Sequence, residues 1–315
     1  MEIDVVTLTL NPALDATAEV DELLPYRKLR GQLVAREPGG GGINVARVLH
    51  RFGVATRAIF PAGGLTGASL IAALARDGVP MEALDSPAPT RESITIWVRS
   101  TGEHYRILVP GEPLPDRVRR ACLEALGAAP APRYVVLSGS LPPELPAAVV
   151  ADVATVARGL GASFVCDSAG EALAAAVDAG ADLVSPNRRE LRELLEPGTA
   201  PEDFDHEAGA RRLVARGVGA VVVSLGSDGA FGVDRSGNET RCPSPAVSVL
   251  SAVGAGDSLL AGVVLGLLRD ESFGEAVQRG VVMGAATCVE HGSELAEPEV
   301  AEALLDEARR VSSPD

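Results

Sequence analysis

The hydrophobic positions of this chain follow two alternating patterns. Short, nearly continuous apolar runs, such as Val5 to Leu10 and Val135 to Leu137, are typical of strands buried on both faces. Between them lie longer segments with apolar residues every three or four positions, such as Ala147 to Arg158, which indicate amphipathic helices. This alternation predicts an α/β protein with a mostly parallel central sheet. The closing region predicts three helices, near 257–270, 274–289 and 298–310.

One part of the chain breaks this alternation. Residues 93–98 and 104–109 alternate apolar and polar side chains around a Thr-Gly-Glu turn, which predicts a β-hairpin with one half-exposed face. Residues 17–36 contain Pro25 and show no helical period. We therefore expect about 16–36 and 90–110 to form a small separate sheet that acts as a lid. Because no interdomain linker is visible, residues 1–315 are predicted to be one domain.

Composition and charge narrow the possible functions. The 315 residues are 46% hydrophobic but only 3% aromatic, so aliphatic side chains must form most of the core. A formal net charge of −15 argues against a nucleic-acid or anionic-membrane partner. Lys28 is the only lysine, which excludes a Walker A motif and the strand lysine of protein kinases. The four cysteines and four histidines are dispersed, which disfavours a zinc site.

The sequence also bears on location. No apolar run approaches the ~18 residues that are needed to span a bilayer. The first residues, Met-Glu-Ile-Asp-Val-Val, lack the basic region of a signal peptide and are typical of a strand. We therefore expect a soluble cytoplasmic protein without a membrane partner.

The strongest candidate for chemistry is a glycine-containing turn before the first closing helix. Gly254-Ala255-Gly256-Asp257 precedes an apolar segment of helical length. The glycines permit a tight turn with uncovered N–H groups, and the helix N-terminus adds partial positive charge, so the turn suits a phosphate. A carboxylate at Asp257 could accept the proton of an attacking hydroxyl. Alternatively, Asp257 only caps the helix.

A second glycine run, Gly39 to Gly42, leads into an amphipathic helix that begins near Ile43. Four consecutive glycines indicate that the backbone approaches another group closely, although a flexible linker would have the same composition. The run lacks the G-x-G-x-x-G spacing of dinucleotide-binding proteins. Because a linker would not continue straight into a strong helix, a binding role is favoured.

Polar residues near predicted strand ends are further candidates, because ligands of open α/β sheets bind at the carboxyl edge. Asp15 follows the first strand and could accept hydrogen bonds from sugar hydroxyls, or it could be an ordinary loop aspartate. Lys28 and Arg30 are two positions apart and would share one face of a strand. These two cations and Arg91 suit a phosphate, although all three could be solvated surface residues.

Three later turns complete the candidates. Ser140 lies in a turn that follows a buried strand. Asn187 and Glu190 are three apart at a helix start, where they could organise water around a magnesium ion or simply form a capping box. Ser224 begins a glycine turn that could hold the phosphates or ribose of an adenine nucleotide.

Together these motifs resemble the PfkB family of the ribokinase superfamily of sugar kinases. Both family signatures occur in order, Pro38 to Arg47 and Gly254 to Asp257, with the N-x-x-E motif Asn187 to Glu190 between them. The similarity covers the whole chain. Through Thr7 to Asp15 it is closest to the branch of 6-phosphofructokinases, 1-phosphofructokinases and tagatose-6-phosphate kinases. It implies a ribokinase-like three-layer α/β/α sandwich with a small β-sheet lid.

The resemblance implies ATP-dependent phosphorylation of a ketohexose phosphate, foremost fructose 6-phosphate to fructose 1,6-bisphosphate, with Asp257 as the general base. It also implies a homodimer, because the lids of this family commonly pair between subunits. The remaining implied roles are stabilisation of the phosphoryl group by Gly254, Ala255 and Gly256; sugar binding by Asp15, Gly40, Gly41 and Asn44; phosphate binding by Lys28, Arg30, Arg91 and Ser140; and Mg-ATP binding by Asn187, Glu190 (to the metal through water), Ser224, Gly226 and Gly229.

Three positions depart from the pattern of this branch. Ser185 stands where a lysine commonly contacts the ATP phosphates, and Ala252 stands where threonine is usual. In the segment 290–294 an acid stands where arginine is usual, near a potassium-binding loop. The resemblance therefore implies ATP and Mg²⁺ but leaves open whether K⁺ binds.

Two classes of function remain open. The first is a sugar-phosphate kinase, whose substrate could also be fructose 1-phosphate or tagatose 6-phosphate. The second is a sugar or nucleotide sensor on the same fold that has no catalytic activity. The presence of Asp257 beside Gly254 and Gly256 favours the kinase, because a sensor needs no base at this point.

Overall fold

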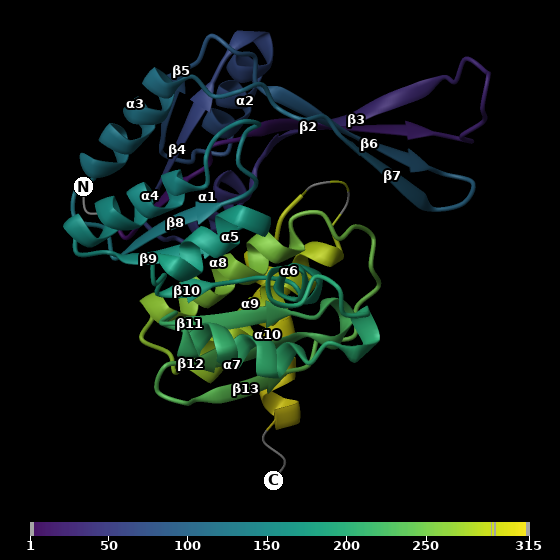
Figure 1. Ribbon diagram of the computed structural model, residues 1–315. Coiled ribbons are helices and arrows are strands. Elements are labelled where there is room, and N and C mark those ends of the chain that lie inside the picture. Colours follow the sequence, from purple (N-terminus) through teal and green to yellow (C-terminus); the bar gives the residue numbers. More distant parts are fainter. Residues whose placement is uncertain (1–2, 291, 293, 313–315) are drawn as a thin grey trace.

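The computed structural model describes residues 3–290, 292 and 294–312 (Figure 1). Among these residues, nine strands form a central sheet in the order β13-β12-β11-β10-β9-β8-β1-β4-β5. Neighbouring strands from β11 to β5 run parallel, and β12 and β13 add an antiparallel edge. The bounds are β1 (Val5–Leu8), β4 (Thr56–Ala62), β5 (Met81–Asp85), β8 (Tyr134–Ser138), β9 (Ser163–Asp167), β10 (Leu183–Val184), β11 (Ala220–Ser224), β12 (Ala230–Asp234) and β13 (Glu239–Cys242).

Helices cover both faces of this sheet, which explains the continuous apolar runs of its inner strands. In β8, Leu137 belongs to the cluster on one face, whereas Val136 belongs to the cluster on the other. The first face is covered by α3 (Asp116–Gly127), α4 (Ala148–Gly159), α5 (Gly170–Asp178), α6 (Arg188–Leu195) and α7 (His206–Ala215). The second is covered by α1 (Gly41–Arg51), α2 (Gly64–Arg76), α8 (Ala255–Leu268), α9 (Phe273–Cys288) and α10 (Pro298–Ser312). The predicted three-layer α/β/α sandwich with a mostly parallel sheet is confirmed.

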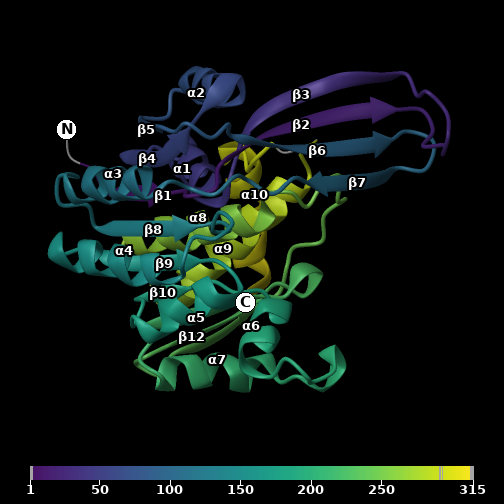
Figure 2. The same cartoon turned by 45° about the horizontal axis from the view of Figure 1, so that its top comes forward.

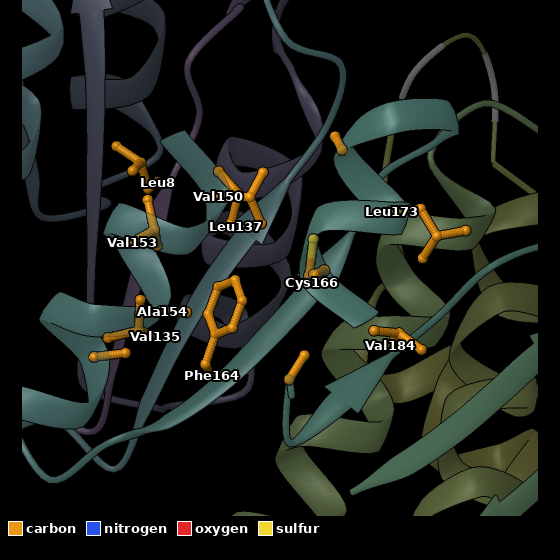
Figure 3. Close-up of a cluster of buried hydrophobic side chains, with 14 of the residues drawn as sticks. Leu8, Val135, Leu137, Val150, Val153, Ala154, Phe164, Cys166, Leu173 and Val184 are labelled. Carbon is orange, nitrogen blue, oxygen red and sulfur yellow. The ribbon is translucent and has the colours of Figure 1, made fainter. Parts of the chain in front are cut away.

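Aliphatic side chains fill the interior, as the low aromatic content requires. Figure 3 shows part of the larger cluster, in which Leu137 of β8 and Phe164 of β9 are buried together with Val153 of α4. The three closing helices begin and end within a few residues of their predicted bounds. The pattern gave no signal for α3, α7 or the antiparallel edge β12–β13, all of which the structure contains.

A second sheet, which we call the small sheet, projects from the body as an arm (Figures 1 and 2). Among the described residues it has the strand order β3-β2-β6-β7. Strands β2 and β6 are parallel, and the two outer pairs are antiparallel. The bounds are β2 (Ala13–Val20), β3 (Gly31–Gly39), β6 (Arg91–Val98) and β7 (Glu103–Leu108).

The two faces of the small sheet differ in polarity because side chains alternate along each strand. The register places Thr17, Thr95 and Arg106 in one row, on the same face as Asp15. Thr17, Thr95 and Asp15 are buried. The opposite face carries aliphatic and aromatic side chains that are exposed to different degrees, among them Leu33, Ile94, Tyr105 and Ile107. We call these the polar face and the apolar face.

Among the described residues, no helix is both long enough and apolar enough to cross a membrane.

Candidate active site

Candidate residues gather at the carboxyl edge of the central sheet. Strands β8, β9 and β11 end at Ser138, Asp167 and Ser224, which are side by side or nearly so in the sheet order. The N-termini of α1 and α8 reach the same edge, as the contact between Asn44 and Asp257 shows. Open α/β sheets bind their ligands in the crevice outside the carboxyl ends of their strands.

The turn before α8 requires glycine. Gly254 caps the helix with φ 79°, a left-handed conformation that disfavours other residues. A Cβ atom at this position would also lie 2.5 Å from Leu295 Cδ2. Because α8 begins at Ala255, Asp257 lies in its first turn. Backbone N–H groups there lack intrahelical partners, and the helix dipole favours negative charge.

Asp257 is held by one hydrogen bond. Asn44 Nδ2 donates to Asp257 Oδ2 at 2.8 Å, and this contact joins the first turns of α1 and α8. Among the described residues Asp257 accepts no other hydrogen bond, so Oδ1 is available to a ligand. Burial raises the pKa of the Asp257 carboxyl, whereas donation by Asn44 and the positive charge of Arg106 oppose this shift. The geometry leaves an oriented carboxylate that can accept a proton.

The glycine run before α1 packs against the strand ends. A Cβ at Gly39 would lie 2.6 Å from the Asp15 carboxyl carbon, and a Cβ at Gly41 would collide with Ser138 Oγ and lie 2.8 Å from the Gly139 nitrogen. Gly40 has φ 112° and caps α1. The linker interpretation is therefore wrong, because each glycine lets the backbone fit closely against another segment.

Asp15 lies on the polar face of the small sheet at the mouth of this edge. It is buried, and its Oδ1 has no hydrogen-bond partner among the described residues. Arg106 Nη2 of β7 lies 3.8 Å from Asp15 Oδ2, too far for a hydrogen bond. A buried carboxylate oxygen without a donor is costly unless a ligand supplies one. The sequence analysis did not select Arg106, because the hairpin pattern relates Arg106 to Thr95 but not to Asp15, which lies on the distant strand β2.

Asp167 is a further residue that the sequence analysis did not select. It ends β9 and accepts a hydrogen bond from Ser138 Oγ at 3.1 Å. Burial, together with the negative charges of Asp257 and Glu190, raises the pKa of Asp167 to about 8. Its position after the buried run Phe164 to Cys166 was the available signal, the same one that selected Asp15.

Arg91 and Ser140 both contact Asn11, Arg91 at its backbone and Ser140 at its side chain. The Arg91 guanidinium donates to the carbonyl oxygen of Asn11 at 3.2 Å and to that of Val109 at 3.4 Å. Asn11 Nδ2 donates to Ser140 Oγ at 3.1 Å. Burial lowers the pKa of Arg91, while the charge of Asp15 opposes this shift. The two residues therefore lie close together near the start of β2, within electrostatic reach of Asp15.

A cavity of about 560 Å³ lies on the other side of the α8 turn. Its polar rim includes Ser224, Gly226, Gly229 and Gly256. The remaining wall is largely apolar and is formed by Pro245, Ala246, Val247, Leu259, Val281 and Ala285. An apolar cavity with a few polar groups at one end suits a flat ring system attached to a charged chain.

Asn187 and Glu190 form a capping box at the start of α6. Asn187 Oδ1 accepts from the Glu190 backbone nitrogen at 2.9 Å, and Glu190 Oε2 accepts from the Asn187 nitrogen at 3.0 Å. Asn187 also bridges to Ser224 at the end of β11. The capping interpretation is thus confirmed, and it is compatible with a further role because the box lies beside the cavity.

The fit of a magnesium ion depends on Asp167 and Glu190. Among residues 3–290, 292 and 294–312, no group of three or more aspartate, glutamate, histidine or cysteine side chains could hold a metal ion. Magnesium, however, usually takes one or two carboxylates and completes its shell with phosphate oxygens and water. Asp167 is close enough to Glu190 for that charge to raise its pKa. These residues therefore fit an ion that arrives with a nucleotide.

Lys28 and Arg30 do not share a strand face, so this prediction was wrong. Both lie in the connection between β2 and β3, and both are exposed. The register pairs Gly31, the residue after Arg30, with Val20 at the far end of β2. The connection forms the tip of the arm in Figure 1. Proline and polar residues interrupt the strand pattern there, and the chain turns before the strand resumes.

The comparisons with known proteins agree with this fold. The model of the pfkB family of carbohydrate kinases matches residues 3–300, and the chain belongs to this family. It is 40% identical over 293 residues to the ATP-dependent 6-phosphofructokinase isozyme 2 of Mycobacterium tuberculosis, covering 92% of this chain and 85% of that one. It is 38% identical to the Escherichia coli enzyme of the same name, covering 93% and 95%.

A solved structure is similarly close. The crystal structure of phosphofructokinase-2 from Escherichia coli in complex with fructose-6-phosphate superposes with a TM-score of 0.90 at 36% identity, covering 98% of this chain and 100% of that one. Other structures of the same enzyme are a complex with potassium and a tetrameric inhibited form. The sequence analysis left open whether K⁺ binds near the segment 290–294. Two residues of that segment, His291 and Ser293, lie outside the described residues.

Proposed function

We propose that this protein transfers the γ-phosphoryl group of ATP to the C1 hydroxyl of fructose 6-phosphate. The single observation that carries this proposal is the position of Asp257. It lies in the first turn of α8, is oriented by Asn44, and follows Gly256, which lines the cavity. The charge of Asp15 also reaches the Asp257 carboxyl and raises its pKa. The names of the relatives support the same reaction.

The reaction follows from this arrangement. The C1 oxygen attacks the γ-phosphorus, the bond from that phosphorus to the β–γ bridging oxygen breaks, and its electron pair stays with ADP. The hydroxyl proton passes to Asp257, whose Oδ1 is free to receive it. The N–H groups of Gly254, Ala255 and Gly256 stabilise the charge on the transferred group, together with the dipole of α8. Such a transfer needs positioning and charge stabilisation more than covalent help.

The sugar phosphate binds between the glycine run and the small sheet. Asp15 uses its unpartnered Oδ1 to accept a hydrogen bond from a sugar hydroxyl, which removes the cost of an unpaired buried oxygen. Gly40, Gly41 and Asn44 line the same side of the sugar. Arg91 and Ser140 hold the 6-phosphate near Asn11.

ATP binds in the cavity beside α8. Its adenine ring lies against the apolar wall, and Ser224, Gly226 and Gly229 bind the ribose or phosphates. Mg²⁺ supplies positive charge to the phosphates. Glu190 would hold this ion through water, with Asn187 beside it, and Asp167 would serve as a second carboxylate.

The small sheet serves as the lid of a single domain formed by residues 1–315, and its apolar face pairs with that of a second copy. Exposed fractions of 57% for Leu33 and 49% for Ile107 are high for aliphatic side chains on one sheet face. In addition, Asp15 and Val20 are five residues apart on β2, which is roughly 17 Å, so the tip residues Lys28 and Arg30 extend away from their own site. Both observations are explained if each tip delivers its cations to the partner's sugar phosphate.

A substrate panel tests this function. The protein is incubated with Mg-ATP and, separately, fructose 6-phosphate, fructose 1-phosphate, tagatose 6-phosphate, fructose and ribose, and ADP formation is followed. We expect the highest kcat/KM with fructose 6-phosphate and fructose 1,6-bisphosphate as its product. A higher kcat/KM with another phosphorylated sugar would show that fructose 6-phosphate is not the preferred substrate. If no sugar is phosphorylated, the protein is better explained as a sensor without catalytic activity.

A further inference from the structure

The site contains two arginines that differ in how their donors are used. The Arg91 guanidinium already donates to the carbonyl oxygens of Asn11 and Val109, which leaves it only part of its donors for the 6-phosphate. Among the described residues, the Arg106 guanidinium donates no hydrogen bond and has one ion pair, at 3.8 Å from Asp15. Its side chain is 41% exposed. Arginine presents five N–H donors in a planar fork that matches phosphate oxygens, so Arg106 is a cation with donors available for a ligand.

Arg106 stands opposite the turn that binds the transferred phosphoryl group. It lines a cavity of about 450 Å³ together with His104 and with Ser251, Ala252 and Val253. These last three residues lead directly into Gly254. The register pairs Arg106 with Thr95 on the polar face of the small sheet. The guanidinium therefore lies between the carboxylate that receives the sugar and the segment that begins the phosphate-binding helix.

The charges around Asp257 support this position. Among the groups that shift the pKa of Asp257, Arg106 is the cation, and it lowers that pKa while Asp15 raises it. Its charge also lowers the pKa of Arg91. Arg106 thus acts electrostatically on both Asp257 and Arg91, although it lies 3.8 Å from Asp15, its charged partner among the described residues.

We propose that Arg106 is a catalytic residue that leaves Asp15 when the substrates bind and donates to the nonbridging oxygens of the phosphoryl group during its transfer. This inference rests on the proposed function. The atoms balance as in that reaction: the C1 oxygen gains the phosphoryl group, ADP keeps the electron pair, and Asp257 takes the proton. Arg106 neither gains nor loses a proton, and its donors are positioned for the three equatorial oxygens over which the charge of the transferring group is spread in the transition state.

Two properties of the pair with Asp15 make the exchange feasible. Arg106 is 41% exposed and its Nη2 lies 3.8 Å from the buried Asp15 carboxylate, too far for a hydrogen bond, so little is lost when the pair opens. A sugar hydroxyl that donates to Asp15 replaces the arginine as its partner. Binding of the sugar therefore releases the guanidinium as the phosphoryl group is brought near it.

The test compares Arg106→Gln and Arg106→Lys with Arg99→Gln, a matched control on the same sheet. Arg99 pairs with Glu19 at 2.6 Å and Asp21 at 3.5 Å, at the far end of the sheet. At saturating Mg-ATP and fructose 6-phosphate, we expect kcat of Arg106→Gln to fall by ~10²–10³, as for loss of one donor to a developing oxyanion. Arg106→Lys should retain an intermediate kcat, and guanidinium chloride should partly restore Arg106→Gln. Arg99→Gln should match the wild type.

A fall in kcat of less than about tenfold would overturn the inference, whatever happens to KM, because a residue that only binds the sugar phosphate changes KM. A different result would contradict the proposed function. If the wild-type protein phosphorylates none of the sugars, the reaction itself is wrong, whereas an active wild type with an equally active Arg106→Gln variant contradicts only the role of Arg106.

Discussion

The carboxyl edge of the central sheet and the polar face of the small sheet contribute to one site by different physical means. At the edge, backbone segments touch so closely that Gly41 admits no side chain, and Asn44 fixes Asp257 at 2.8 Å. On the small sheet, Arg106 is partly exposed and stands 3.8 Å from its partner. Rigid packing suits a base that must be oriented, and loose pairing suits cations that must change partners.

After the effects on kcat, the largest effect is expected on substrate binding at Lys28. If Lys28 contacts the sugar phosphate across a dimer, Lys28→Ala should raise KM for fructose 6-phosphate by ~10–100-fold, the loss expected for a charged hydrogen bond, with a smaller change in kcat. Steady-state kinetics measure this effect. Glu22→Gln, an exposed change in the same tip, should leave both parameters near those of the wild type.

Mixing variants tests whether Lys28 acts on the partner. A Lys28→Ala chain keeps its own Asp257, and an Asp257→Asn chain keeps its own Lys28. After the two are denatured and refolded together, half of the dimers are mixed and each contains one intact site. When fructose 6-phosphate is kept well below the KM of the Lys28→Ala variant, about a quarter of wild-type activity should therefore return. Activity no higher than the average of the separate variants would show that Lys28 does not act across the interface.

A smaller effect is expected from packing at the rigid edge. Gly41→Ala places a methyl group against Ser138 Oγ and the Gly139 backbone. We expect a loss of ~1–3 kcal/mol in the free energy of unfolding, as for overpacking in a core, measured by urea denaturation. Gly159→Ala is the control, because its Cβ would meet nothing within 4 Å. If both variants are equally stable, the edge is not as tightly packed as the contacts indicate.

The smallest effect is the contribution of Asp167 to the pH dependence of the free energy of unfolding. Its pKa is raised to about 8, so the folded state keeps a proton that the unfolded chain releases near pH 4. The folded state therefore binds more protons between about pH 4 and 8, and the free energy of unfolding falls as the pH rises through this window. Asp167→Asn removes this contribution. Thermal unfolding of both proteins from pH 5 to 8 without Mg²⁺ should give a shallower decline for the variant, and parallel curves would contradict the shift.

How much could be predicted from the sequence differed between the two regions. The central sheet and the turns at Gly41 and Gly254 carry local signals, because burial on both faces and left-handed backbone restrict the residues allowed. The closeness of Arg106 to Asp15 depends on strand register between segments that are far apart in the sequence. Local patterns do not encode such register, so Arg106 was missed.

The wrong prediction for Lys28 and Arg30 has a related cause. Residues two apart share a face only in a strand, and these two lie in the connection between β2 and β3, which is not a strand. Asp167 was missed for a different reason. Its position after a buried strand was visible in the sequence, but the charges of Asp257 and Glu190 that set it apart come from distant segments.

The most direct test of the account is kcat of Asp257→Asn at saturating Mg-ATP and fructose 6-phosphate, with the nucleotide affinity measured separately. Asparagine keeps the shape and the contact with Asn44 but cannot take the proton. The account predicts a fall of ~10²–10⁴ in kcat with ATP still bound. Turnover equal to that of the wild type would contradict the assignment of Asp257 as the base.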